Sequence, residues 1–123
     1  MLDHASISVP KDQFEDVIAW YIKALEPLGY KKIHEYAGLA VGLGDPKPDF
    51  WIGARDEGRS VQHIAFGAKD RDTVRKFYEA AIAAGGKDNG GPGVRSSYHE
   101  HYYGAFVFDP VGNNVEAVCH SPE

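Results

Sequence analysis

Glu116 is a lone acidic residue in an apolar run of the kind that forms a buried strand. The run, at 114–118, follows the turn-forming sequence Asp-Pro-Val-Gly at 109–112. Removing an ionised carboxylate from water costs several kcal/mol unless a cation neutralises it. Glu116 is therefore expected to face a cation.

Two histidines are the candidates to share that cation. His4 and His63 are each the third residue of a segment with the pattern of a strand, at 2–9 and 61–68. Two imidazoles and one carboxylate form a ligand set that divalent metals of intermediate hardness prefer. The sequence therefore predicts a metal site made by His4, His63 and Glu116.

The first half of the chain predicts one strand, one helix and three further strands. The helix is expected to begin after an Asp12 N-cap and to end near Gly29, and three strands follow at 31–36, 39–43 and 50–55. In the strand before this helix, His4 shares its face with serines rather than with apolar residues. We expect that face to line a cavity while the apolar face packs against the helix.

The second half of the chain repeats this order. A strand at 61–68 is followed by a helix that Asp70 or Asp72 caps, and a hairpin of 105–108 and 114–120 closes the chain. His63 follows His4 by 59 residues, at the same point of its strand. These similarities predict an internal duplication within a single domain at 1–123, with one module at about 1–56 and the other at about 60–120.

Composition limits the classes of function. Of the 123 residues, 43% are hydrophobic and 25% charged, which is typical of a globular domain, and no segment has the apolar length of a membrane span. The net charge of -5, with scattered basic residues, argues against a nucleic-acid surface. A single cysteine, Cys119, excludes an internal disulfide, and the N-terminus has no signal-peptide pattern, so we expect a cytoplasmic protein. The remaining candidates for a binding partner are a small molecule and another protein.

Two copies of strand, helix and three strands, with His early in each copy and Glu in the last strand, resemble the vicinal oxygen chelate superfamily. This superfamily includes glyoxalase I, extradiol dioxygenases and the fosfomycin- and bleomycin-resistance proteins. The most specific part of the resemblance is Phe-Asp-Pro-Val-Gly-Asn-Asn-Val-Glu at 108–116. It implies an α+β fold in which two paired βαβββ modules form an open, curved sheet cup with the helices outside. It also implies that relatives of this length form homodimers.

The resemblance further implies that His4, His63 and Glu116 hold a divalent ion such as Fe, Mn, Zn or Ni. Glyoxalase I has a fourth ligand in the last strand of the first module, and the alignment puts Trp51, or after a slip of one residue Phe50 or Ile52, at that place. None of these side chains coordinates metal, and Asp49 is out of register, which argues against glyoxalase I activity.

Aromatic and basic residues are expected to bind a substrate in the cup. The candidates, none of which a motif singles out, are Trp51, Tyr98, His101, Tyr103 and Arg95. By contrast, Cys119 alternates away from Glu116 and is expected to be a core thiol. No residue is indicated as a general base.

The sequence supports one main function and two alternatives. The main one is a metal-dependent enzyme that binds a small substrate through vicinal oxygens on the cation. The first alternative is a metal-free protein that sequesters a small molecule, as in the bleomycin-resistance branch. The second is a glyoxalase-like lyase in which another group replaces the missing fourth ligand.

Overall fold

The computed structural model describes residues 3–56, 58 and 61–123. The first module contains β1 (Ala5–Pro10), α1 (Phe14–Leu25), β2 (Lys31–Tyr36), β3 (Ala40–Gly44) and β4 (Pro48–Arg55). The second contains β5 (His63–Gly67), α2 (Arg71–Ala83), β6 (Lys87–Asp88), β7 (Gly93–Val94), β8 (Tyr103–Phe108) and β9 (Asn114–Cys119). Short 3-10 turns at Lys11–Gln13 and Glu26–Leu28 flank α1.

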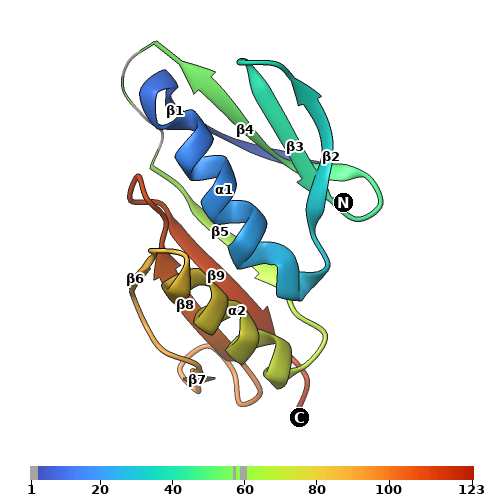
Figure 1. Cartoon of the computed structure of the whole chain (residues 1–123). Helices are drawn as coiled ribbons and strands as arrows, with labels where there is room; N and C mark the ends of the chain where they lie inside the picture. The colour runs from blue at the N-terminus through green and yellow to red at the C-terminus, as the bar shows by residue number, and fades with distance from the viewer. Residues whose placement is uncertain (1–2, 57, 59–60) are drawn as a thin grey trace.

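The two modules have the same sheet topology. The first sheet has the order β1-β4-β3-β2 and the second the order β5-β9-β8-β6, with β7 also on β8. In each sheet the first strand runs parallel to the last one, β1 beside β4 and β5 beside β9. Both helices lie on the same side of the sheets, so the other side is left open (Figure 1). The predicted α+β fold of two βαβββ modules is confirmed.

The starts of the two helices differ from each other in their capping. Asp70 caps α2 as predicted, because its carboxylate accepts from the Thr73 amide at 2.8 Å. The predicted Asp12 cap is wrong, because Asp12 lies inside a 3-10 turn and α1 begins at Phe14 after Gln13, without a side-chain cap. A capping pattern in sequence cannot distinguish a helix start from a 3-10 turn that precedes it.

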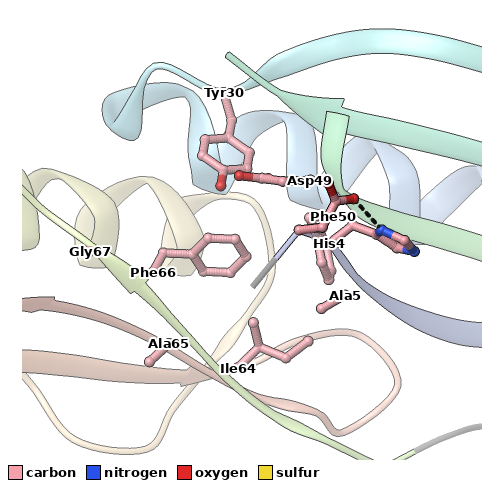
Figure 2. Close-up of a pocket in the computed structure, with 10 residues that line it drawn as sticks. His4, Ala5, Tyr30, Asp49, Phe50, Ile64, Ala65, Phe66 and Gly67 are labelled. Carbon is pink, nitrogen blue, oxygen red and sulfur yellow. Dashed lines mark hydrogen bonds and ion pairs between the residues drawn. The ribbon is translucent and has the colours of Figure 1, made fainter. Parts of the chain in front are cut away.

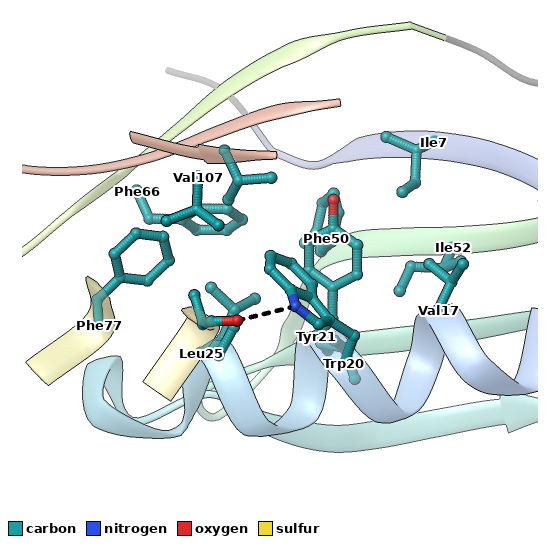
Figure 3. Packing of buried hydrophobic residues seen from close by; sticks show 14 of the residues in the cluster. Ile7, Val17, Trp20, Tyr21, Leu25, Phe50, Ile52, Phe66, Phe77 and Val107 are labelled. Carbon is teal, nitrogen blue, oxygen red and sulfur yellow. Dashed lines mark hydrogen bonds between the residues drawn. The ribbon is translucent and has the colours of Figure 1, made fainter. Parts of the chain in front are cut away.

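A core of aromatic and aliphatic side chains joins the two modules. The rings of Phe50 in β4 and Phe66 in β5 meet edge to face with centroids 5.4 Å apart. Between the helices, Trp20 Nε1 donates to the Ala81 carbonyl at 3.1 Å (Figure 3). Cys119 is buried on the helix side of β9, as predicted.

The turn between β8 and β9 is tied to α1 through Asp109. One carboxylate oxygen of Asp109 accepts from the amides of Val111 and Asn113, and the other accepts from the Asn113 side chain. Tyr21 of α1 donates its hydroxyl to the same carboxylate at 2.6 Å. Burial, followed by the charge of Asp109, raises the pKa of Tyr21, so the phenol stays protonated. The most specific sequence of the chain is therefore a structural node between the modules.

Candidate functional site

His63 and Glu116 meet on the open face of the second sheet. Glu116 in β9 pairs across with Ala65 of β5 and Phe106 of β8, so its side chain points away from the helices. His63 Nε2 lies 3.0 Å from Glu116 Oε1. The carboxylate is almost completely buried, at 1% exposed, while half of the His63 side chain is open to solvent. The site thus consists of the buried carboxylate of Glu116 and the half-exposed imidazole of His63 beside it.

The protonation of His63 is fixed from its other nitrogen. His63 Nδ1 lies 3.1 Å from the Asn114 carbonyl oxygen, which can only accept a hydrogen bond. Nδ1 therefore carries a proton, and Nε2 faces the Glu116 carboxylate with a lone pair unless a second proton or a cation lies between them. Metal-binding histidines are commonly held in this way, with the far N–H on a backbone carbonyl.

Tyr102 holds the second oxygen of Glu116. Its hydroxyl donates to Glu116 Oε2. Gly104 in β8 leaves the room for this contact, because a Cβ there would lie 3.3 Å from both Glu116 Oε2 and the Tyr102 ring. The ring of Phe106 stacks on His63, with centroids 6.3 Å apart and planes 21° apart. Only Oε1 of Glu116 is left to interact with His63 or a shared cation.

The Tyr102 contact predicts a measurable pH dependence. Burial first, and then the hydrogen bond and charge of Glu116, raise the pKa of Tyr102 from 10.0 to about 12. The folded state therefore keeps this proton more tightly than the unfolded state, so its stability contribution is complete below pH 10 and is lost as the pH rises towards 12. Urea unfolding at pH 8 and pH 11 should show a larger loss of stability in the wild type than in Tyr102→Phe. Equal losses in the two proteins would contradict the contact.

His4 does not join this pair within one chain. Its Nδ1 pairs with the exposed Asp3 at 2.7 Å, and more than half of its side chain is exposed. His4 lines a cavity of about 190 Å³ where the two modules meet, together with Tyr30, Asp49 and Phe66 (Figure 2). Among the described residues, no group of three or more His, Cys, Asp or Glu side chains is placed to hold a metal ion. The structure thus brings together two of the three predicted ligands.

Trp51 occupies the place that Glu116 has in the other module. Trp51 pairs with Ser6 in β1, two residues after His4, as Glu116 pairs with Ala65, two residues after His63. The strand register thus places an indole side chain at this position of the first module. The indole lies over Gly42, where an added Cβ would come within 2.9 Å of it, and stacks on Tyr36 with centroids 6.1 Å apart.

Two other predicted substrate-binding residues have different surroundings from those expected. Tyr103 pairs with Cys119 and lies on the helix side of the sheet, where the guanidinium of Arg71 covers its ring at 4.9 Å. Arg95 turns back onto its own loop and donates to the carbonyls of Gly91 and Gly93. Tyr103 therefore faces the helices and not the cup, whereas Arg95 is held by its own loop and its guanidinium lies over the Phe106 ring, 5.2 Å from the ring centroid.

Tyr98 and His101 lie in the loop before β8, next to the site. Tyr98 is 65% exposed, and its ring packs edge to face on Tyr102 at 4.8 Å. His101 is partly exposed, with Glu100 at 3.6 Å. Tyr102 was not predicted as a site residue, because no local signal in the sequence distinguishes the tyrosine that reaches Glu116.

The pair of His63 and Glu116 suits a divalent cation. An imidazole nitrogen of His63 and a carboxylate oxygen of Glu116 converge, and the Tyr102 hydroxyl donates to the other carboxylate oxygen. These donors are those of zinc, iron, manganese and nickel sites. A third protein ligand would have to come from outside this group.

Solved structures share this fold, although no family model and no curated protein sequence matches the chain at a significant level. A glyoxalase/bleomycin resistance protein from Albidiferax ferrireducens aligns with a TM-score of 0.78 at 22% identity, over 95% of this chain and 98% of the other. A glyoxalase/bleomycin resistance protein/dioxygenase family enzyme from Burkholderia phytofirmans aligns at 0.76 and 19%, over 98% of each chain. A lactoylglutathione lyase from Agrobacterium tumefaciens aligns at 0.65 and 16%, over 93% of this chain and 90% of the other.

These alignments cover between 93% and 98% of this chain. In the described part of the chain, no helix is long and apolar enough to cross a membrane. The resemblance noted in the sequence is therefore confirmed at the level of the fold, because this chain has the fold of solved structures described as glyoxalase, bleomycin-resistance and dioxygenase-family proteins.

Proposed function

We propose that the protein is a metal-dependent enzyme that binds a small oxygenated substrate on a divalent cation held by His63, Glu116 and His4. The observation that carries the proposal is the pairing of His63 Nε2 with buried Glu116 Oε1, since the contact of Nδ1 with the Asn114 carbonyl directs Nε2 at the carboxylate. An ionised buried carboxylate that faces a lone pair is unfavourable without a proton or a metal cation between them, and this is the position that the proposed cation would take.

His4 is proposed to reach the site from a second copy of the chain. Its imidazole pairs with Asp3, whose side chain is 94% exposed. Exposed ion pairs contribute little stability, so His4 is free to leave this contact for a better one. The protein would then be a homodimer in which each cation is shared between a second module and the partner's first module.

Each side chain has a separate task in the proposed site. A bound cation would supply Lewis-acid stabilisation of negative charge on substrate oxygens. Tyr102 holds Glu116 Oε2, so the carboxylate offers only Oε1 and leaves coordination positions to the substrate. Phe106 covers one face of the His63 ring and limits the access of water to it. Trp51 and Tyr36 offer an aromatic surface for an apolar part of the substrate.

Metal content tests the proposed ligands. The wild type, His63→Ala and His4→Ala would be loaded with Mn, Fe, Zn or Ni, gel-filtered and analysed for bound metal. Both variants should lose most of the metal, because each removes one of three ligands. His34→Ala is the matched control, since His34 is an exposed histidine in contact with Tyr36 and Trp51. Full metal retention in both ligand variants would contradict the proposal.

Mixing the two variants that are expected to lose metal tests the shared site. If His4 and His63 of different copies hold one cation, a mixed dimer of His4→Ala and His63→Ala has one intact site and one that lacks both histidines. The mixture should then recover about a quarter of the wild-type metal content, because half of the dimers are mixed and each has one of its two sites. No recovery after subunit exchange would indicate that both histidines act within one chain.

A metal-free binding protein is the second candidate, favoured by a different observation. A group of aromatic rings lies on the open side of the first sheet and consists of Trp51, Tyr36 and His34. Among the described residues of one chain, no three His, Cys, Asp or Glu side chains are grouped to hold a metal ion. Such a surface suits the stacking of a planar ligand. Unchanged ligand affinity after metal stripping, with loss of affinity in Trp51→Ala, would favour this function over the enzyme.

A further inference from the structure

His99 and His120 form a second pair of imidazoles outside the proposed site. His99 Nε2 lies 2.8 Å from His120 Nδ1, and the two rings are nearly parallel, with planes 24° apart and centroids 5.1 Å apart. His99 belongs to the loop between β7 and β8, and His120 follows directly after β9. Both side chains are exposed, so ions from solvent can reach the nitrogens.

Tyr102 supports both rings of the pair. Its ring meets His99 at 5.5 Å and His120 at 5.2 Å between centroids, edge to face in each case. The same tyrosine donates its hydroxyl to Glu116. Because one side chain contacts both histidines and the acid, the pair is held in place from the interior of the module.

The hydrogen bonds identify the proton between the two rings. The His101 amide donates to His99 Nδ1 at 3.1 Å, so this nitrogen is an acceptor. In the neutral ring the proton is then on Nε2, from which it is donated to His120 Nδ1. Two nitrogen atoms from different segments thus converge on a single proton, as they would converge on a metal ion.

We propose that His99 and His120 bind a divalent ion that favours square-planar coordination, such as Cu²⁺ or Ni²⁺. Two nitrogens at about 2.0 Å from such an ion, in adjacent positions, are about 2.8 Å apart, whereas a tetrahedral zinc site separates them by about 3.3 Å. The observed separation is 2.8 Å. On binding, the proton of His99 moves from Nε2 to Nδ1, the contact with the His101 amide opens, and water fills the remaining positions.

A bound ion would connect the loop to the end of β9. It would replace one shared proton by two metal–nitrogen bonds and would restrict the Tyr102 ring that lies against both imidazoles. The proposed ligands differ from His63 and Glu116, and Tyr102 is the side chain that contacts both sites.

Copper titration tests the pair directly. The background protein carries His4→Ala and His63→Ala, so that copper at the site proposed for function does not contribute. In this background at pH 8, calorimetry should show one Cu²⁺ site and electron paramagnetic resonance should show nitrogen ligands. Adding His99→Asn or His120→Asn should weaken binding by about a hundredfold, since the chelate effect of two tethered ligands is lost. Adding His34→Asn should leave the affinity unchanged.

His99→Asn and His120→Asn change different segments of the chain, so a loss of copper affinity in both is not explained by a local disturbance of one segment. Circular dichroism establishes that each remains folded. Unchanged copper affinity in either variant would overturn the proposal, as would loss of affinity in His34→Asn. Because His4 and His63 are absent throughout, failure here leaves the proposed function untouched.

Discussion

Replacing Asp109 by alanine is expected to lower the free energy of unfolding by about 4 kcal/mol, because several buried donors lose their acceptor together. The lost partners are the Tyr21 hydroxyl, the Asn113 side-chain amide and the backbone amides of Val111 and Asn113. Asp109 is 5% exposed, so water cannot replace the carboxylate without opening the turn. Chemical unfolding followed by circular dichroism measures the loss.

Tyr21→Phe is the matched control for Asp109→Ala. It removes one of the donors and keeps the ring that packs against Phe50 at 5.0 Å. We expect a loss of about 1 kcal/mol from this variant, and a double variant that loses less than the sum of the two single losses. If Asp109→Ala were no more destabilising than Tyr21→Phe, the turn would not act as a node between the modules.

The turn at 109–112 shows which features of the protein could be predicted from the sequence and which could not. Asp, Pro and Gly at 109–112 indicated a turn, and the two histidines 59 residues apart indicated the duplication. These are local signals. The contact of Tyr21 with Asp109 spans 88 residues, and no local pattern marks its two ends.

The site was predictable only as far as strand alternation determines it. Alternation correctly put Glu116 and Cys119 on opposite faces and His63 on the face of Glu116. The loop before β8 has no such period, so the contact between Tyr102 and Glu116 could not be distinguished from one made by Tyr98 or Tyr103. The contacts of Arg95 could not be predicted for the same reason, since this side chain donates to carbonyls of a glycine-rich loop. The position of His4 relative to His63 and Glu116 depends on how the first module packs against the second. Periodic patterns in the sequence carry no information on that packing.

Glu116→Gln is expected to stabilise the metal-free protein and to remove most of its metal affinity. Glutamine keeps an acceptor for the Tyr102 hydroxyl, and its amide can donate to the lone pair of His63 Nε2. A buried charge is replaced by a satisfied neutral group, so the free energy of unfolding without metal should rise by about 1–2 kcal/mol. Metal affinity should fall by about a hundredfold or more, because an anionic ligand becomes a neutral one. Unfolding in a chelator and calorimetric metal titration measure the two effects.

The sign of the stability change separates a metal site from a structural ion pair. If His63 were doubly protonated and paired with Glu116 for stability, Glu116→Gln would leave a charged imidazole opposite an amide and would destabilise the metal-free protein. A metal site requires the opposite result, a chain that is more stable without its carboxylate and less able to hold a cation, since binding residues are commonly kept at a cost in stability. Glu116→Ala cannot make this distinction, because it also opens a cavity beside Tyr102 and Gly104.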